Sequence, residues 1–168
     1  GLMMGEHGLF GKVVPYEPST RVPLLVRGAG FPEGAHVDAQ VASVDVAPTI
    51  AALAGAEPLV EQDGRSLFPL AQDPPSEDGD PRAMLLENGP SSAVLPHYDG
   101  VRVDGWVYVE WETGELELYD LREDPSQLES LHTSVDHAEV REQLAALLDQ
   151  LRTCEGSACD AYASVSYP

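Results

Sequence analysis

The sequence predicts an α/β chain in which a strand–helix piece precedes a small antiparallel sheet with a packing helix. Three patterns indicate this order. An apolar run at residues 21–27 is followed by a helical pattern at 43–55. Valines and aromatic residues then dominate residues 101–119, and a stripe with helical spacing occupies 137–152. The change from an apolar run to β-type and then helical patterning separates the elements.

The first piece combines a buried strand with a helix. Residues 21–27 are short, apolar and bounded by glycine, which is typical of a buried strand in a mixed sheet. Residues 43–55 predict a helix with Asp45 as the N-cap and Gly55 just beyond the last turn. One face of this helix carries apolar residues that we expect to cover the sheet: Val46, Ile50 and Leu53.

A loop-like region separates the two pieces. Residues 56–82 lack a clear period, and the Pro- and acid-rich stretch 72–81 is the best boundary within them. We therefore expect an α/β part, a small antiparallel α+β subdomain and a short tail, which correspond to residues 1–75, 82–160 and 161–168.

The second piece reads as a sheet with one helix. Residues 83–87 predict a short strand, and residues 101–111 and 115–119 predict strands flanking a turn at Thr113-Gly114. The last element is a helix over about 137–152, with Asp136 and Glu139 at capping-box spacing. Its apolar stripe is expected to pack on the sheet.

The charge balance excludes several partners. The 168 residues contain 29 Asp and Glu but only nine Lys and Arg, for a formal net charge of -20. Nucleic acids and anionic membranes need clustered cations, so neither is an expected partner. No apolar run is long enough to span a bilayer, and no signal peptide is visible in this chain. Eight of the nine cations are Arg, which leaves Lys12 as the single lysine.

Two cysteines lie close together near the end of the chain. Cys154 and Cys159 have no histidine nearby, so a zinc site is disfavoured, and a local disulfide is the better interpretation. The alternative is a pair of free thiols. A disulfide would indicate an oxidising compartment, and thus a secreted or cell-envelope protein.

The strongest chemical constellation follows a Gly-rich start. Gly11 precedes Lys12, whose compact ammonium could reach into a cleft and neutralise a developing anion. Glu17 and Arg21 are four residues apart and could pair if the segment is helical. On spacing alone a solvated surface lysine explains Lys12 as well.

A resemblance adds to this interpretation. The pattern G-E-H-G-L-F-G-K-x-x-x-Y-E-x-x-x-R-V-P-L-L-V-R-G at residues 5–28 is similar to a stretch of the type I sulfatases, members of the alkaline phosphatase superfamily. Further similar segments follow in family order at residues 43–55, 63–70, 101–110 and 117–125. The resemblance implies the C-terminal part of an alkaline-phosphatase-like α/β fold, followed by the small antiparallel subdomain.

The resemblance also implies roles for particular residues. Lys12 matches the family lysine that contacts the sulfate group. His7 is either a proton donor or substrate contact, or a satisfied loop histidine. His97 is either a substrate contact from the C-terminal subdomain or an exposed loop residue. Three motif residues are expected to be structural: Tyr16, Glu17 and Arg21. Gln127 departs from the family pattern at what we expect to be a surface turn.

The family's attacking group is not expected in this chain. Type I sulfatases use formylglycine made from the cysteine of a C-x-P/A-x-R motif, which neither cysteine here matches. Their Ca²⁺ ligands come from motifs that are not present in these 168 residues, the last of which would immediately precede Gly1. We therefore expect an inactive chain that needs an N-terminal sulfatase region as its partner. The complete enzyme would use Ca²⁺ and formylglycine.

The expected reaction is hydrolysis of a sulfate ester on a small molecule or a sulfated glycan. The acidic exterior favours a small or lightly sulfated substrate over a heparin-like polymer. Two alternatives stay open. One is a phosphate or phosphonate ester hydrolase of the same superfamily, and the other is a non-catalytic binding or structural module derived from the fold.

Overall fold

The computed structural model describes residues 1–73, 82–90 and 95–160. These form two compact units, each assembled from separate parts of the chain. Of the described residues, the first unit combines Gly1–Pro23 with Met84–Arg152, and the second combines Leu24–Ala83 with residues 153–160. The division differs from the expected one, since the first residues of the chain pack with the antiparallel sheet. The Pro- and acid-rich stretch 74–81 and the tail 161–168 lie outside the described residues.

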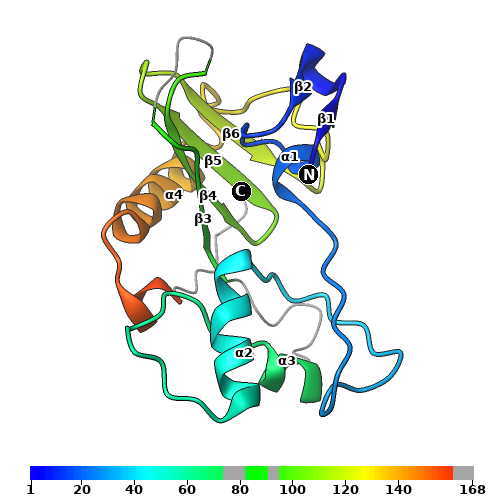
Figure 1. The fold of residues 1–168 in the computed structure, drawn as a ribbon. Coiled ribbons are helices and arrows are strands. Elements are labelled where there is room, and N and C mark those ends of the chain that lie inside the picture. The colour runs from blue at the N-terminus through cyan, green and yellow to red at the C-terminus, as the bar shows by residue number, and fades with distance from the viewer. Residues whose placement is uncertain (74–81, 91–94, 161–168) are drawn as a thin grey trace. The chain divides into compact units, whose positions relative to one another are not determined.

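The first unit is built on a four-stranded antiparallel sheet, seen in the centre of Figure 1. Its strands lie side by side in sequence order, so each neighbouring pair is joined directly along the chain. The strands are β3 (Met84–Glu87), β4 (Tyr98–Val103), β5 (Trp106–Trp111) and β6 (Leu116–Asp120). The predicted strands at 83–87 and 115–119 are therefore confirmed to within one residue.

The predicted strand at residues 101–111 is two strands. Asp104 and Gly105 have φ of 47° and 77°, and they form the turn that joins β4 to β5. An Asp-Gly pair accepts left-handed backbone at both positions, which suits a two-residue hairpin turn. The second turn, at Thr113-Gly114, lies between β5 and β6 as predicted, with Gly114 at φ 97°.

Both faces of the sheet are covered, which explains why most of β5 is buried. Helix α4 (Ala138–Leu151) packs on one face through an apolar stripe made of Val140, Leu144, Leu147, Leu148 and Leu151. The other face carries the cluster of Tyr98, Val107, Val109 and Tyr119, against which Tyr16 packs. The N-terminal segment thus covers the face opposite α4 (Figure 1).

The N-terminal segment contains only short elements. Strands β1 (Met3–Met4) and β2 (Phe10–Gly11) pair antiparallel around a 3₁₀ turn, η1 (Glu6–Gly8). A single helical turn, α1 (Glu17–Thr20), follows. The N-terminal segment is therefore a small ribbon and one helical turn.

The second unit holds the predicted helix as η2 (Ser43–Asp45) followed by α2 (Val46–Ala54), with Gly55 at φ 61° closing it. A short helix that the sequence reading missed, α3 (Phe68–Gln72), and a 3₁₀ turn, η3 (Gly156–Cys159), complete the unit. A disulfide joins Cys154 to Cys159, with 5.1 Å between their Cα atoms.

Asp45 is the N-cap residue of α2, as predicted, but its side chain makes no capping bond to α2, because its carboxylate accepts from Ala42 and Arg65 instead. Three other expectations, for the helices and the apolar run, are wrong. The N-cap of α4 is His137 rather than Asp136, without a side-chain cap. Residues 21–27 form no strand, and Leu25 is 94% exposed. Val46, Ile50 and Leu53 of α2 are also exposed, because no sheet in the described residues covers them.

A buried ion pair stabilises the second unit. Asp45 and Arg82 are 0% and 2% exposed, and the Arg82 Nη1 donates to Asp45 Oδ2 at 2.7 Å. The Asp45 carboxylate also accepts from the backbone N–H groups of Ala42 and Arg65. Arg82 Nε lies 2.7 Å from Asp160, directly after the disulfide.

No helix among the described residues is long and apolar enough to cross a membrane.

Candidate functional site

The loop that carries Lys12 is shaped by unusual backbone angles. Gly11 has φ of 116° and Val13 has φ of 70°, so both neighbours of Lys12 leave the extended region. A glycine adopts such an angle without steric cost, which explains Gly11. The lysine side chain is exposed and borders a hollow of about 190 Å³, lined otherwise by apolar residues and Gly11: Met3, Leu9, Phe10, Val13, Val14 and Leu95. Among the described residues, Lys12 has no ion-pair partner.

His7 lies on the same N-terminal ribbon but is tied to other groups. Its backbone has φ of 53°, and its ring stacks on the Tyr16 ring with 3.9 Å between centroids and 6° between planes. Its Nε2 lies 2.9 Å from the Ser126 carbonyl oxygen, and because a carbonyl can only accept, this nitrogen carries a proton and donates the hydrogen bond. The stacking and the hydrogen bond together fix the orientation of the imidazole.

Tyr16 anchors the ribbon to the sheet. Its hydroxyl donates to Glu117 Oε1 at 3.3 Å, and its ring meets the edge of Tyr119. Burial, reinforced by the negative charge of Glu117, raises the pKa of Tyr16 to about 12. The phenol therefore stays protonated at neutral pH.

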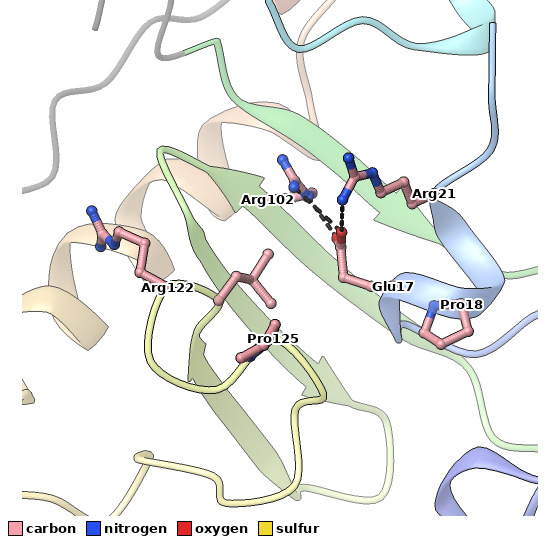
Figure 2. A pocket seen from close by; sticks show the side chains of 7 residues that line it. Glu17, Pro18, Arg21, Arg102, Arg122 and Pro125 are labelled. Atoms are coloured by element: carbon pink, nitrogen blue, oxygen red, sulfur yellow. Dashed lines mark hydrogen bonds and ion pairs between the residues drawn. The ribbon is translucent and has the colours of Figure 1, made fainter. Parts of the chain in front are cut away.

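Glu17 links the segment to two distant parts of the chain. Its carboxylate accepts from Arg102 Nε at 2.8 Å, and its backbone N–H donates to Gln127 Oε1 at 2.7 Å (Figure 2 shows the first contact). Arg21 reaches the same carboxylate at 4.0 Å and is 79% exposed. The turn at this position lies at the surface as expected, with Leu128 exposed, but Gln127 itself is buried within it. These contacts hold α1 against the sheet.

Arg102 and Gln127 were not found by sequence reasoning. Arg102 lies in a strand pattern and Gln127 in a turn, and neither has a local signal that names a partner far away in the chain. A buried backbone N–H needs an acceptor, but the sequence does not say which side chain supplies it.

His97 lies at the start of β4 in a group of acids. Its Nε2 is 3.1 Å from Asp99 Oδ1, and its backbone N–H donates to Glu112 Oε1. Asp99 also accepts from Arg152 Nε at 2.8 Å, at the end of α4. No hydrogen bond joins His97 to Lys12 or His7 in the described part of the chain.

The described residues offer neither a metal site nor a free thiol. No group of three or more His, Cys, Asp or Glu among them could hold a metal ion. Both cysteines are bonded to each other. Within residues 1–73, 82–90 and 95–160, no such group fits Ca²⁺ and no free thiol could become formylglycine.

Three comparisons identify the family. The family model described as N-sulphoglucosamine sulphohydrolase, C-terminal, matches residues 5–154. An arylsulfatase of Chlamydomonas reinhardtii is 32% identical over 193 residues, covering 95% of this chain and 29% of that protein. This chain therefore spans less than a third of the length of that relative.

Two solved structures are similar in fold to this chain. One is a protein in complex with its substrate D-glucosamine-2-N,6-O-disulfate, with a TM-score of 0.79 and 26% identity over 90% of this chain and 32% of that one. The other is a phosphonate monoester hydrolase of Agrobacterium radiobacter, with a TM-score of 0.76 and 27% identity over 90% of this chain and 33% of that one. With the family match over residues 5–154, the chain belongs to the sulfatase family and represents its C-terminal part.

Proposed function

We propose that this chain is the sulfate-binding C-terminal part of an enzyme that hydrolyses a sulfate ester, and that Lys12 contacts the sulfuryl oxygens. The observation that carries the proposal is the position of Lys12, exposed beside an apolar hollow and without an ion-pair partner among the described residues. An ammonium that is not already paired can offset the charge that develops on the sulfuryl group in the transition state.

His7 is proposed to position the loop rather than to transfer a proton. Its Nε2 is engaged by the Ser126 carbonyl, and its ring lies flat on Tyr16. The first contact connects the ribbon to the turn after β6, and the second connects it to Tyr16, which packs on the sheet. Tyr16, Glu17 and Arg21 have the same supporting role, and Arg21 contributes least because it is largely exposed.

The attacking group and the metal are proposed to come from an N-terminal sulfatase region. In the complete enzyme, residues of that region would carry the formylglycine nucleophile and would hold the Ca²⁺ that offsets sulfate charge. This chain alone is then inactive on sulfate esters. Its apolar run at residues 22–26 and the exposed face of α2 are proposed to pack against that region. The disulfide supports a secreted or cell-envelope location.

A sulfated sugar is the proposed substrate class. The structural neighbour that binds D-glucosamine-2-N,6-O-disulfate supports it. The net charge of -20 favours a small or lightly sulfated substrate, because a negative exterior slows the encounter with polyanions.

The test joins this chain to the proposed N-terminal sulfatase region and measures hydrolysis of 4-nitrophenyl sulfate. The joined protein is expected to turn over, whereas the 168-residue chain alone is not. The Lys12→Ala variant should lose about 100-fold in kcat/KM, as expected when one charge-stabilising group is removed. Arg27→Ala, an exposed cation in the second unit, is the matched control. An unchanged kcat/KM for Lys12→Ala would reject the role of Lys12.

A second candidate reaction is hydrolysis of a phosphonate monoester, which the phosphonate monoester hydrolase neighbour favours. The same joined protein discriminates the two reactions when 4-nitrophenyl phenylphosphonate replaces the sulfate ester. A higher kcat/KM on the phosphonate would select the second candidate.

A further inference from the structure

A second hollow in the first unit gathers a large share of the chain's few cations. It has a volume of about 450 Å³ and is shown in Figure 2. Its lining comes from α1, from β4 and from the turn after β6, and consists of Glu17, Pro18, Arg21, Arg102, Leu121, Arg122 and Pro125. Three of the nine Lys and Arg residues of a chain with 29 acids therefore line one hollow. Lys12 is not among its lining residues.

Two of the three guanidinium groups are held in place by neighbours. Arg102 donates through Nε to Glu17 Oε1 at 2.8 Å. Arg122 donates through Nε to Asp120 Oδ1 at 2.8 Å, and its guanidinium carbon lies 5.5 Å from the centre of the Trp106 ring. Such groups lose little conformational freedom when a ligand binds, which favours binding.

The backbone beneath Arg122 leaves room for its guanidinium. A Cβ at Gly105 would lie 3.1 Å from Arg122 Nε, which is tighter than ordinary contact. Gly105 also has φ of 77°, an angle that other residues rarely adopt. The glycine therefore allows the backbone angle of the hairpin turn and leaves space for the Arg122 side chain.

The charge of the lining selects the ligand class. Three Arg against Glu17, which lines the hollow, and Asp120, which pairs with Arg122, leave one net positive charge at the hollow. Guanidinium groups bind the oxygens of sulfate and carboxylate groups through paired hydrogen bonds. A hollow of this volume also accommodates a sugar ring beside the anionic group.

We propose that this hollow is an oxyanion-binding site, separate from Lys12, for a sulfate group that is either a free ion or part of a sulfated sugar. Arg21, Arg102 and Arg122 bind its oxygens, while Pro18, Leu121 and Pro125 form its apolar wall. Glu17 orients Arg102. The site does not depend on hydrolysis of any ester, so it stands whether or not Lys12 acts in catalysis.

The test follows the Arg Nε–Hε signals of the 168-residue chain by NMR during titration with sodium sulfate, against sodium chloride of equal ionic strength. Saturable shifts are expected for Arg102 and Arg122. Arg21→Gln and Arg122→Gln should each weaken sulfate binding about tenfold, because each removes a charge-assisted contact. Arg27→Gln, an exposed arginine that does not line the hollow, is the matched control and should leave the affinity unchanged.

The source of the anion is decided by parallel titrations with glucosamine 6-sulfate and with N-acetylglucosamine. Tighter binding of the sulfated sugar than of inorganic sulfate supports a glycan ligand, and equal binding supports the free ion. Shifts that do not saturate, equal affinity in Arg122→Gln with its fold intact, or equal binding of the neutral sugar would each overturn the site. Since the readout is binding, the result is independent of any assay of ester hydrolysis.

Discussion

Replacing Arg82 by Met should destabilise the second unit more than any surface charge change. Asp45 is 0% exposed, and the Arg82 Nη1 donates to its Oδ2 at 2.7 Å. The Met side chain fills much of the space of the Arg stem but provides no donor. Asp45 would then keep only the backbone N–H groups of Ala42 at 2.8 Å and Arg65 at 2.9 Å.

The magnitude follows from the charge that is left behind. Removing one partner of a buried ion pair costs about 3–5 kcal/mol of unfolding free energy. The two remaining backbone donors place the expected loss near the lower value, about 3 kcal/mol. Asp160 adds little, since it is 27% exposed and can be solvated once Arg82 is gone. The double variant Arg82→Met with Asp45→Asn should recover at least about 1 kcal/mol, because the buried carboxylate is then neutral.

Hydrogen exchange read out by mass spectrometry is the suitable assay, because peptides from residues 24–73 report on the second unit and those from 98–151 on the first. Asp38→Asn is the control, since its pair with His36 is exposed at 69% and 87%. That change should cost less than about 0.5 kcal/mol. If Arg82→Met loses no more protection in residues 24–73 than Asp38→Asn, the pair does not stabilise the unit and the reasoning is refuted.

Two further predictions concern acid stability and strand packing. Although burial opposes it, hydrogen bonds from Arg82 and from two backbone N–H groups lower the pKa of Asp45 below 3.8. The stability that this carboxylate contributes is therefore present above pH 3.8 and is lost as pH falls through the lower folded-state pKa. Urea titrations at several acid pH values should show the free energy of unfolding fall with pH, and Asp45→Asn should reduce that dependence. Gly100→Ala would place a Cβ 2.8 Å from the Tyr108 carbonyl oxygen. The variant should lose about 1–3 kcal/mol of unfolding free energy, measured by thermal unfolding. Gly89→Ala, with no atom within 4 Å of its Cβ, is the control, and equal melting of the two variants would contradict the packing account.

The antiparallel sheet and its helix could be predicted because their signals are local. The stripe of α4 and the valine-rich strands each indicate an element without reference to the rest of the chain. The turn at Asp104-Gly105 was overlooked because valines and aromatic residues on both sides favour an uninterrupted strand. The Asp-Gly pair was the available signal.

The fate of the apolar run at residues 21–27 could not be predicted from the sequence. An apolar run indicates burial, but burial requires a neighbouring element, and the described residues provide none for Leu25. The exposed face of α2 has the same cause. The apolar composition of a segment indicates that it can be buried, whereas only the structure shows whether a neighbouring element covers it.

The site was predictable in part. Lys12 was singled out as the one lysine beside a glycine, and its sulfate role came from the family resemblance. The pairing of Glu17 with Arg102 was not visible, because the two residues are separated by 85 positions and meet only through the fold. The hollow with three arginines likewise depends on bringing α1, β4 and the turn after β6 together.

The link between Arg82 and Asp160 has a consequence for how the chain is made. The strands β3 to β6 and helix α4 are all encoded between these two residues, yet they belong to the other unit. During synthesis from the N-terminus, Arg82 emerges long before the acid that completes its surroundings. The second unit thus reaches its final hydrogen bonding only after the whole of the sheet unit has been translated, and contacts so far apart in sequence slow folding. A protein cut after Arg152 would retain the entire sheet, but its second unit would lack Asp160, the acid that contacts Arg82.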